Sequence, residues 1–97
     1  MEQNAIFLEV AAEFIQTLAI TDQAKIAANI VMLRSGDFSS VHVKQLDGQI
    51  HELIVKQYRL IFFRKNTTLY VVGAFRKKSA KTPLREIRHA RDIFKNL

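Results

Sequence analysis

Residues 50–75 read IHELIVKQYRLIFFRKNTTLYVVGAF, and this stretch decides the fold. Three runs within it, 50–55, 58–64 and 68–75, are rich in the β-branched and aromatic side chains that favour strands. The connections between the runs are short, so we expect an antiparallel meander. The run 58–64 is apolar on both faces apart from its ends, which places it at the centre of the sheet.

The turns around the meander differ in how clearly the sequence marks them. Asp47-Gly48 is a strong turn signal just before the first strand, and Asn66-Thr67 suits the last connection. Lys56-Gln57 makes a poor two-residue turn, because neither residue favours a positive φ angle. We therefore expect a bend or a bulge at Lys56-Gln57.

The residues before the meander follow helical spacing. One apolar stripe predicts a first helix, and Thr21 or Asp22 can cap a second one that stops at Ser35-Gly36. Residues 5–8 fit a short edge strand as well as the start of the first helix, and the pattern does not decide between them. Two helices joined by about three residues predict an antiparallel hairpin that covers one face of the sheet. The stripes are Phe7, Val10, Phe14 and Leu18 with Ala11 and Ile15, then Ile26, Ile30 and Leu33 with Ala27 and Val31.

A third helix is predicted at the C-terminal end. Thr82 suits its N-cap, and Pro83 suits its first position. Its apolar stripe is Leu84, Ile87, Ala90, Phe94 and Leu97, and its polar face is Arg85, Arg88, His89, Asp92 and Lys95. The predicted fold class is therefore α+β, a single domain over residues 1–97 with an N-terminal helical hairpin, a twisted antiparallel sheet and a C-terminal helix.

Composition excludes several classes of protein. The chain has 97 residues, 48% of them hydrophobic, which is too apolar for a disordered tail. It has no cysteine, so a disulfide scaffold, a thiolate zinc site and a thiol nucleophile are all excluded. No apolar run approaches the roughly 20 residues of a membrane span, and the first residues lack the positive charge of a signal peptide. We expect a cytoplasmic protein.

Charge is distributed unevenly along the chain. Residues 1–43 hold two basic residues against five acidic ones, a net −3, whereas residues 44–97 hold thirteen against four, a net +9. A half-chain this basic favours a polyanionic partner, either nucleic acid or an acidic protein.

Two features concentrate cations where chemistry could occur. Residues 75–83 read FRKKSAKTP, four cations in six positions between the last strand and the last helix, where a phosphate would be well held. A solvated loop is the alternative reading of the same stretch. Arg59 lies in an otherwise apolar strand, where burial is costly without an anionic partner. An ion pair with Glu52 and a contact to phosphate both explain it.

The remaining motifs argue against other chemistry. The histidines at positions 42, 51 and 89 have no partner at a metal-ligand spacing, so no metal site and no cofactor are predicted. The glycine-rich and catalytic motifs of P-loop proteins, dinucleotide-binding folds and serine hydrolases are absent from the sequence.

Six motifs, taken in order, carry a family resemblance. They are Glu13-Phe14-Ile15, Lys44-Gln45-Leu46, Glu52-Leu53, Tyr58-Arg59, Phe75-Arg76-Lys77-Lys78-Ser79-Ala80-Lys81-Thr82-Pro83 and Glu86-Ile87-Arg88-His89-Ala90. In their order and spacing, the chain from Glu13 onward resembles the HigB-like branch of the RelE/ParE superfamily of bacterial and phage toxins. The long motif from Phe75 to Pro83 is the most specific of the six.

The resemblance implies the toxin of a toxin–antitoxin pair, with an RelE-like fold. Such toxins are metal-independent endoribonucleases that cut mRNA on the ribosome and inhibit translation. The ribose 2′-OH attacks the neighbouring phosphorus and leaves a 2′,3′-cyclic phosphate. The implied partners are mRNA, the ribosome and a cognate antitoxin, a helix-turn-helix protein, with no membrane and no small-molecule cofactor.

The resemblance also suggests roles for individual residues. Arg59 together with Arg76, Lys77 or Lys78 would stabilise the scissile phosphate, and Lys81 would hold the neighbouring one. Glu52, His51 and Tyr58 are the candidates for proton transfer. The candidates for gripping RNA are Lys44, Lys56, Arg64, Lys81, Arg85, Arg88 and Arg91.

Three positions depart from the family pattern. His51 stands where an aromatic residue is usual, Ile54 where an Arg is usual, and Gly73-Ala74 where His-Gly is common. Two alternatives to the ribonuclease stay open. One is a nucleic-acid-binding protein of the same fold without cleavage, and the other is a ParE-type inhibitor of gyrase.

Overall fold

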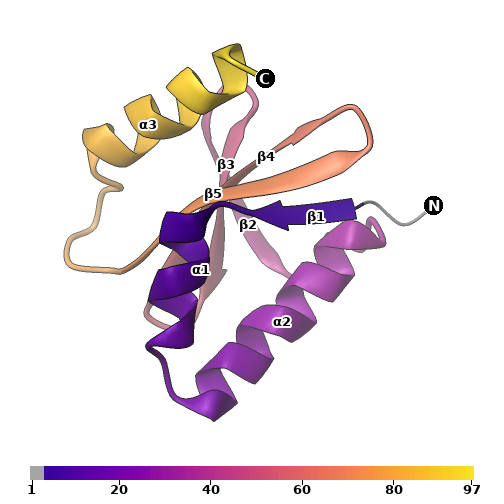
Figure 1. Cartoon of the computed structure of the whole chain (residues 1–97). Coiled ribbons are helices and arrows are strands. Elements are labelled where there is room, and N and C mark those ends of the chain that lie inside the picture. The colour runs from indigo at the N-terminus through magenta and orange to yellow at the C-terminus, as the bar shows by residue number, and fades with distance from the viewer. Residues whose placement is uncertain (1–3) are drawn as a thin grey trace.

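Five strands form one sheet in the order β1-β5-β4-β3-β2 in the computed structural model, which describes residues 4–97 (Figure 1). β1 pairs with β5 in parallel, and all other neighbours are antiparallel. The elements are β1 (Asn4–Phe7), α1 (Glu9–Gln16), α2 (Ile20–Arg34), β2 (His42–Asp47), β3 (Ile50–Val55), β4 (Tyr58–Lys65), β5 (Thr68–Arg76) and α3 (Leu84–Lys95). The α+β class predicted from the sequence is confirmed.

The meander forms the middle of the sheet, as predicted. β3, β4 and β5 begin at the expected residues, and β4 lies at the centre. The structure adds two edge strands. β1 decides the alternative left open at residues 5–8. β2, which was not predicted from the sequence, pairs with β3 across a turn at Gly48 and Gln49.

Helices cover both faces of the sheet (Figure 1). Alternate residues of β4 point to opposite faces. Leu60 and Phe62 pack into a core with α1 and α2, whereas Ile61 and Phe63 pack into a second core with α3. Arg59 shares the parity of Ile61 and Phe63, so its side chain projects to the α3 face.

The Lys56-Gln57 connection is a tight two-residue turn, and the predicted bend or bulge is wrong. Val55 pairs directly with Tyr58, and Lys56 adopts a positive φ of 55°. A lysine tolerates this conformation because its ammonium group is bound 2.7 Å from a carboxylate oxygen of Asp22 in α2. A tertiary contact thus stabilises a turn that the local sequence disfavours.

Both predicted helix caps are also wrong. Asp22 lies inside α2 and Thr82 lies before α3, and neither side chain caps the helix beside it. Each side chain has a distant partner instead, since Asp22 binds Lys56 and Thr82 binds Glu52. The stop at Gly36 is confirmed, with a φ of 83° there.

The apolar stripes are narrower than the spacing predicted. Ile26, Ile30, Leu33 and Ala90 are buried as expected. The outer members are exposed because the helices meet the sheet along one line only; these are Val10, Ala27, Val31, Leu84 and Leu97. No helix within residues 4–97 is long and apolar enough to cross a membrane.

Candidate functional site

A cavity of about 640 Å³ lies beside the α3 face of the sheet, where β5 leads into the following loop. We call residues 76–83 the basic loop. Cations dominate the lining, and one carboxylate, Glu52, lies among them. The seven cationic residues are Lys44, Arg59, Arg76, Lys77, Lys78, Lys81 and Arg85, and the lining also includes His42, Ile54, Phe14 and Phe75.

The sheet register sets the floor of the cavity. His42, Ile54, Arg59 and Phe75 lie directly opposite one another on β2, β3, β4 and β5. Residues that are paired across antiparallel strands project to the same face. The four side chains therefore form one row, and all four line the cavity.

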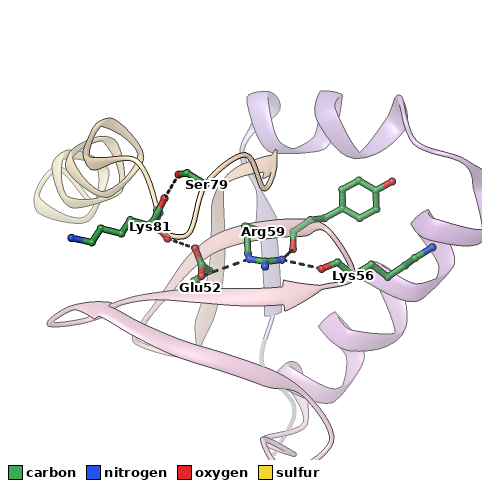
Figure 2. A network of polar contacts seen from close by, with 7 residues as sticks. Glu52, Lys56, Arg59, Ser79 and Lys81 are labelled. Carbon is green, nitrogen blue, oxygen red and sulfur yellow. Dashed lines mark hydrogen bonds and ion pairs between the residues drawn. The ribbon is translucent and has the colours of Figure 1, made fainter.

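Contacts on two sides hold the guanidinium of Arg59 in place (Figure 2). Its Nη1 donates hydrogen bonds to the carbonyl oxygens of Lys56 at 3.0 Å and Tyr58 at 2.9 Å. Its Nε lies 3.9 Å from Oε1 of Glu52, and only 11% of its side chain is exposed. The ion pair predicted from the sequence is therefore present, and the guanidinium also lines the cavity. Contact between Arg59 and a phosphate stays a prediction.

Glu52 has a partner for each of its oxygens. Oε1 faces Arg59, and Oε2 accepts a short hydrogen bond from the hydroxyl of Thr82. Its side chain is 5% exposed. Glu52 thus ties the end of the basic loop to the middle of the sheet and fixes the orientation of Arg59.

The basic loop is exposed but anchored at its start. The Lys77 N–H donates to the Gln57 carbonyl at 2.7 Å, and the Arg76 guanidinium lies 5.1 Å from the centre of the Tyr58 ring. The Lys81 carbonyl accepts a hydrogen bond from Ser79, and the Lys81 side chain extends away from the Arg59–Glu52 pair (Figure 2). The sequence allowed two readings of this stretch, a solvated loop and a cluster of cations that could hold an anion. The basic loop is solvated, and it also contributes cations to the cavity.

Two of the three candidates for proton transfer lie away from the cavity. His51 stacks on Phe62, with 5.6 Å between ring centres, and belongs to the opposite face of the sheet from Glu52. Tyr58 is buried, and its hydroxyl donates to Asp22 at 2.6 Å. Of the candidates named from the sequence, only Glu52 lines the cavity.

Four predicted RNA-gripping cations also lie outside the cavity lining. Lys56 is ion-paired with Asp22, and Arg64 lies 4.4 Å from the centre of the Phe38 ring. Arg88 is exposed on α3, and Arg91 forms an ion pair with Asp47. These four residues belong to the outer surface of the protein. Their contact with RNA stays a prediction.

Asp22 organises a second polar cluster on the hairpin side of the sheet. The hydrogen bond from Lys56 is the main cause that holds the pKa of Asp22 below its usual range, and the one from Tyr58 adds to it. The same two hydrogen bonds raise the pKa of Lys56 and of Tyr58. The cluster fixes the turn whose Gln57 carbonyl receives the Lys77 N–H.

The sequence reading missed three contributors to the site, His42, Thr82 and Phe14. The Asp47-Gly48 signal indicates a hairpin, but a plain two-residue turn at these residues would pair His42 with Leu53. The irregularity between Gln45 and Asp47 shifts the register by one residue and places His42 opposite Ile54. Within residues 4–97, no group of three or more His, Asp or Glu side chains is arranged to hold a metal ion.

Residues 13–95 match the family model described as phage-derived protein Gp49-like. The chain belongs to the Gp49-like family. The match covers the site from Phe14 to Arg85 and includes the Glu52, Arg59 and basic-loop positions. A search of curated proteins found no match.

Solved structures place the fold of this Gp49-like protein among RelE toxins. The archaeal RelE–RelB complex from Pyrococcus horikoshii OT3 has a TM-score of 0.67 at 14% identity, over 82% of this chain and 100% of that one. The isolated E. coli RelE toxin has a TM-score of 0.63 at 13% identity, over 98% of this chain and 99% of that one. The RelE-like fold expected from the sequence is confirmed, and membership of the HigB branch stays a prediction.

Proposed function

We propose that this protein is the toxin of a toxin–antitoxin pair and cleaves mRNA on the ribosome. The observation that carries the proposal is the cavity, in which six further cations surround a partly buried, oriented Arg59. Membership of the Gp49-like family and the RelE fold support it. An RNA phosphodiester is a ligand that such a cavity suits by charge.

The proposed reaction needs positive charge at one place. When the ribose 2′-oxygen attacks the neighbouring phosphorus, negative charge builds up on the phosphoryl oxygens. Preorganised cations stabilise this charge without having to reorganise. Arg59 is the best oriented of them, since Glu52 and two carbonyl groups hold its guanidinium. Arg76, Lys77 and Lys78 supply further charge from the loop, and Lys81 and Arg85 extend it along the RNA.

An antitoxin is the proposed protein partner. The solved complexes with the same fold contain RelE bound to RelB. A cavity lined by seven cations offers an acidic segment of such a partner favourable electrostatics. Occupying the cavity would block RNA, so we propose that binding and inhibition coincide there.

The test is expression of the protein without a partner, followed by mapping of mRNA ends. We expect growth arrest and new 5′ ends, with 2′,3′-cyclic phosphates on the upstream fragments. The double variant Lys77→Ala/Lys78→Ala should cut far more slowly, whereas Lys95→Ala, at an exposed lysine outside the cavity, should cut normally.

Other outcomes separate the alternatives. Salt-sensitive RNA binding without new ends would favour a binding protein that has lost cleavage. Broken DNA without RNA cleavage would favour a gyrase inhibitor. Normal growth with soluble, folded protein present would rule out the toxin.

A further inference from the structure

Cleavage by the ribose 2′-OH needs a group that accepts a proton. Ammonium and guanidinium groups have no lone pair to offer, so the seven cations of the cavity can donate protons but cannot accept one. Among the titratable side chains that line the cavity in residues 4–97, only Glu52 and His42 remain as acceptors.

Glu52 is committed to other contacts. Its two oxygens face Arg59 and Thr82, and its side chain is 5% exposed. Taking up a proton would weaken the ion pair that orients Arg59 at the moment when that cation is needed. Glu52 is therefore a positioning residue.

His42 is exposed and lies in the row of side chains that includes Arg59. The two residues are separated by one strand, since His42 pairs with Ile54 and Ile54 pairs with Arg59. Neighbouring strands are about 4.8 Å apart, so the two backbones are about 10 Å apart. Side chains reaching inward from both ends of that span can contact one nucleotide above Ile54, the imidazole at the ribose and the guanidinium at the phosphate.

We propose that His42 is the general base of the cleavage reaction, a role that rests on the proposed function. Its neutral imidazole takes the proton of the 2′-OH as the 2′-oxygen forms a bond to phosphorus. The bond between phosphorus and the 5′-oxygen breaks, and that oxygen takes a proton from a cavity ammonium or from water. The products are a 2′,3′-cyclic phosphate and a 5′-OH, and no further reactant is required.

The charged side chains around His42 are mostly positive. Lys44 lies on its own strand, Glu52 on β3 and Arg59 on β4, and the cations of the basic loop and Arg85 line the same cavity. A neutral imidazole has one ring nitrogen that accepts a proton, and the imidazolium formed has two N–H groups that can donate one. His42 can therefore accept a proton and return it to water within each turnover.

The experiment measures single-turnover cleavage of an mRNA on programmed ribosomes as a function of pH. We expect His42→Gln to slow cleavage by roughly 100 to 10,000-fold, the usual contribution of a general base. The wild-type rate should rise with pH as the base loses its proton, and the variant should lose that rise. His89→Gln, a change at an exposed histidine on α3, is the matched control and should behave as the wild type.

Two further measurements separate catalysis from structure. Free imidazole should restore part of the activity of His42→Ala, which a merely misfolded variant would not show. A substrate with sulfur in place of the 5′-oxygen, which leaves without protonation, should remain slow with His42→Ala. Rescue by this substrate would assign His42 to the leaving group and overturn its role as the base.

The experiment distinguishes a failure of His42 as the general base from a failure of the proposed function. A wild-type protein that leaves mRNA intact overturns the proposed function and the base together. Wild-type cleavage with an unchanged rate and pH profile in His42→Gln overturns only the base.

Discussion

Two buried carboxylates, Asp22 and Glu52, lie on opposite sides of the sheet and are built alike. Each binds one cation and one hydroxyl, Lys56 and Tyr58 for Asp22, Arg59 and Thr82 for Glu52. Asp22 lies on the hairpin side, away from the cavity, whereas Glu52 lies within its lining. The comparison teaches that the same arrangement can stabilise a turn or orient a functional group, and that location decides which.

Among the residues of these two clusters and the basic loop, the largest effect should come from Arg59, the cation paired with Glu52. Arg59→Lys keeps the charge but loses the planar group held by two carbonyl oxygens and the Glu52 carboxylate, so we expect cleavage to fall by roughly 100 to 1000-fold. Thermal unfolding should change little because Glu52 keeps a cation nearby. Arg59→Ala should also lower the melting temperature, since it leaves a buried carboxylate without its cation. Wild-type cleavage by Arg59→Lys would show that charge alone suffices.

The hydroxyl group of each cluster can be removed separately. Thr82→Val should slow cleavage about tenfold, because a hydrogen bond to a charged group contributes about 1.5 kcal/mol. Tyr58→Phe removes the hydroxyl bound to Asp22 but keeps the ring beneath Arg76. It should lower the melting temperature by several degrees and leave the cleavage rate per folded molecule unchanged. Parallel rate and unfolding measurements check both variants, and equal rate losses would erase the distinction between the two clusters.

The pH dependence of stability should single out Asp22. Its pKa is lower in the folded protein than in the unfolded chain, mainly because of the hydrogen bond from Lys56. The Asp22 contribution is therefore fully present above the unfolded value of about 3.9 and is lost as the pH falls through the folded value. The melting temperatures of wild type and Asp22→Asn should differ at neutral pH and converge in acid. A constant difference would contradict this origin.

The smallest effect should come from a single exposed cation of the basic loop. Lys78→Ala should weaken RNA binding and reduce the slope of log affinity against log salt by about 0.7, the value for one contact to single-stranded RNA. Lys95→Ala should leave the slope unchanged, since Lys95 lies outside the cavity lining. Binding titrations with a short RNA at several salt concentrations measure both slopes.

The sequence predicted the parts of this fold that local patterns encode. The meander, the central place of β4 and the stop at Gly36 follow from strand composition, alternation and glycine chemistry. The errors occur where a side chain has a distant partner. Thr82 suited a cap by its position, and only the folded sheet brings Glu52 to its hydroxyl.

The candidate site, like the fold, was predictable only where local sequence patterns encode it. The cations of residues 76–81 and Arg59 were evident as charges in an unusual place, and all line the cavity. His42 was not evident, because its strand has no buried residue and lacks a clear apolar alternation. Only the register across β2, β3 and β4 brings it to the row that contains Arg59.

The parallel edge strand β1 has a consequence for the order of folding. Asn4 pairs with Thr68, 64 positions further along the chain, whereas the meander joins strands that are immediate neighbours in sequence. Closing so long a loop costs more entropy than closing a hairpin. We expect the meander to form early and β1 to dock last, so during synthesis residues 4–7 wait for β5 before they enter the sheet.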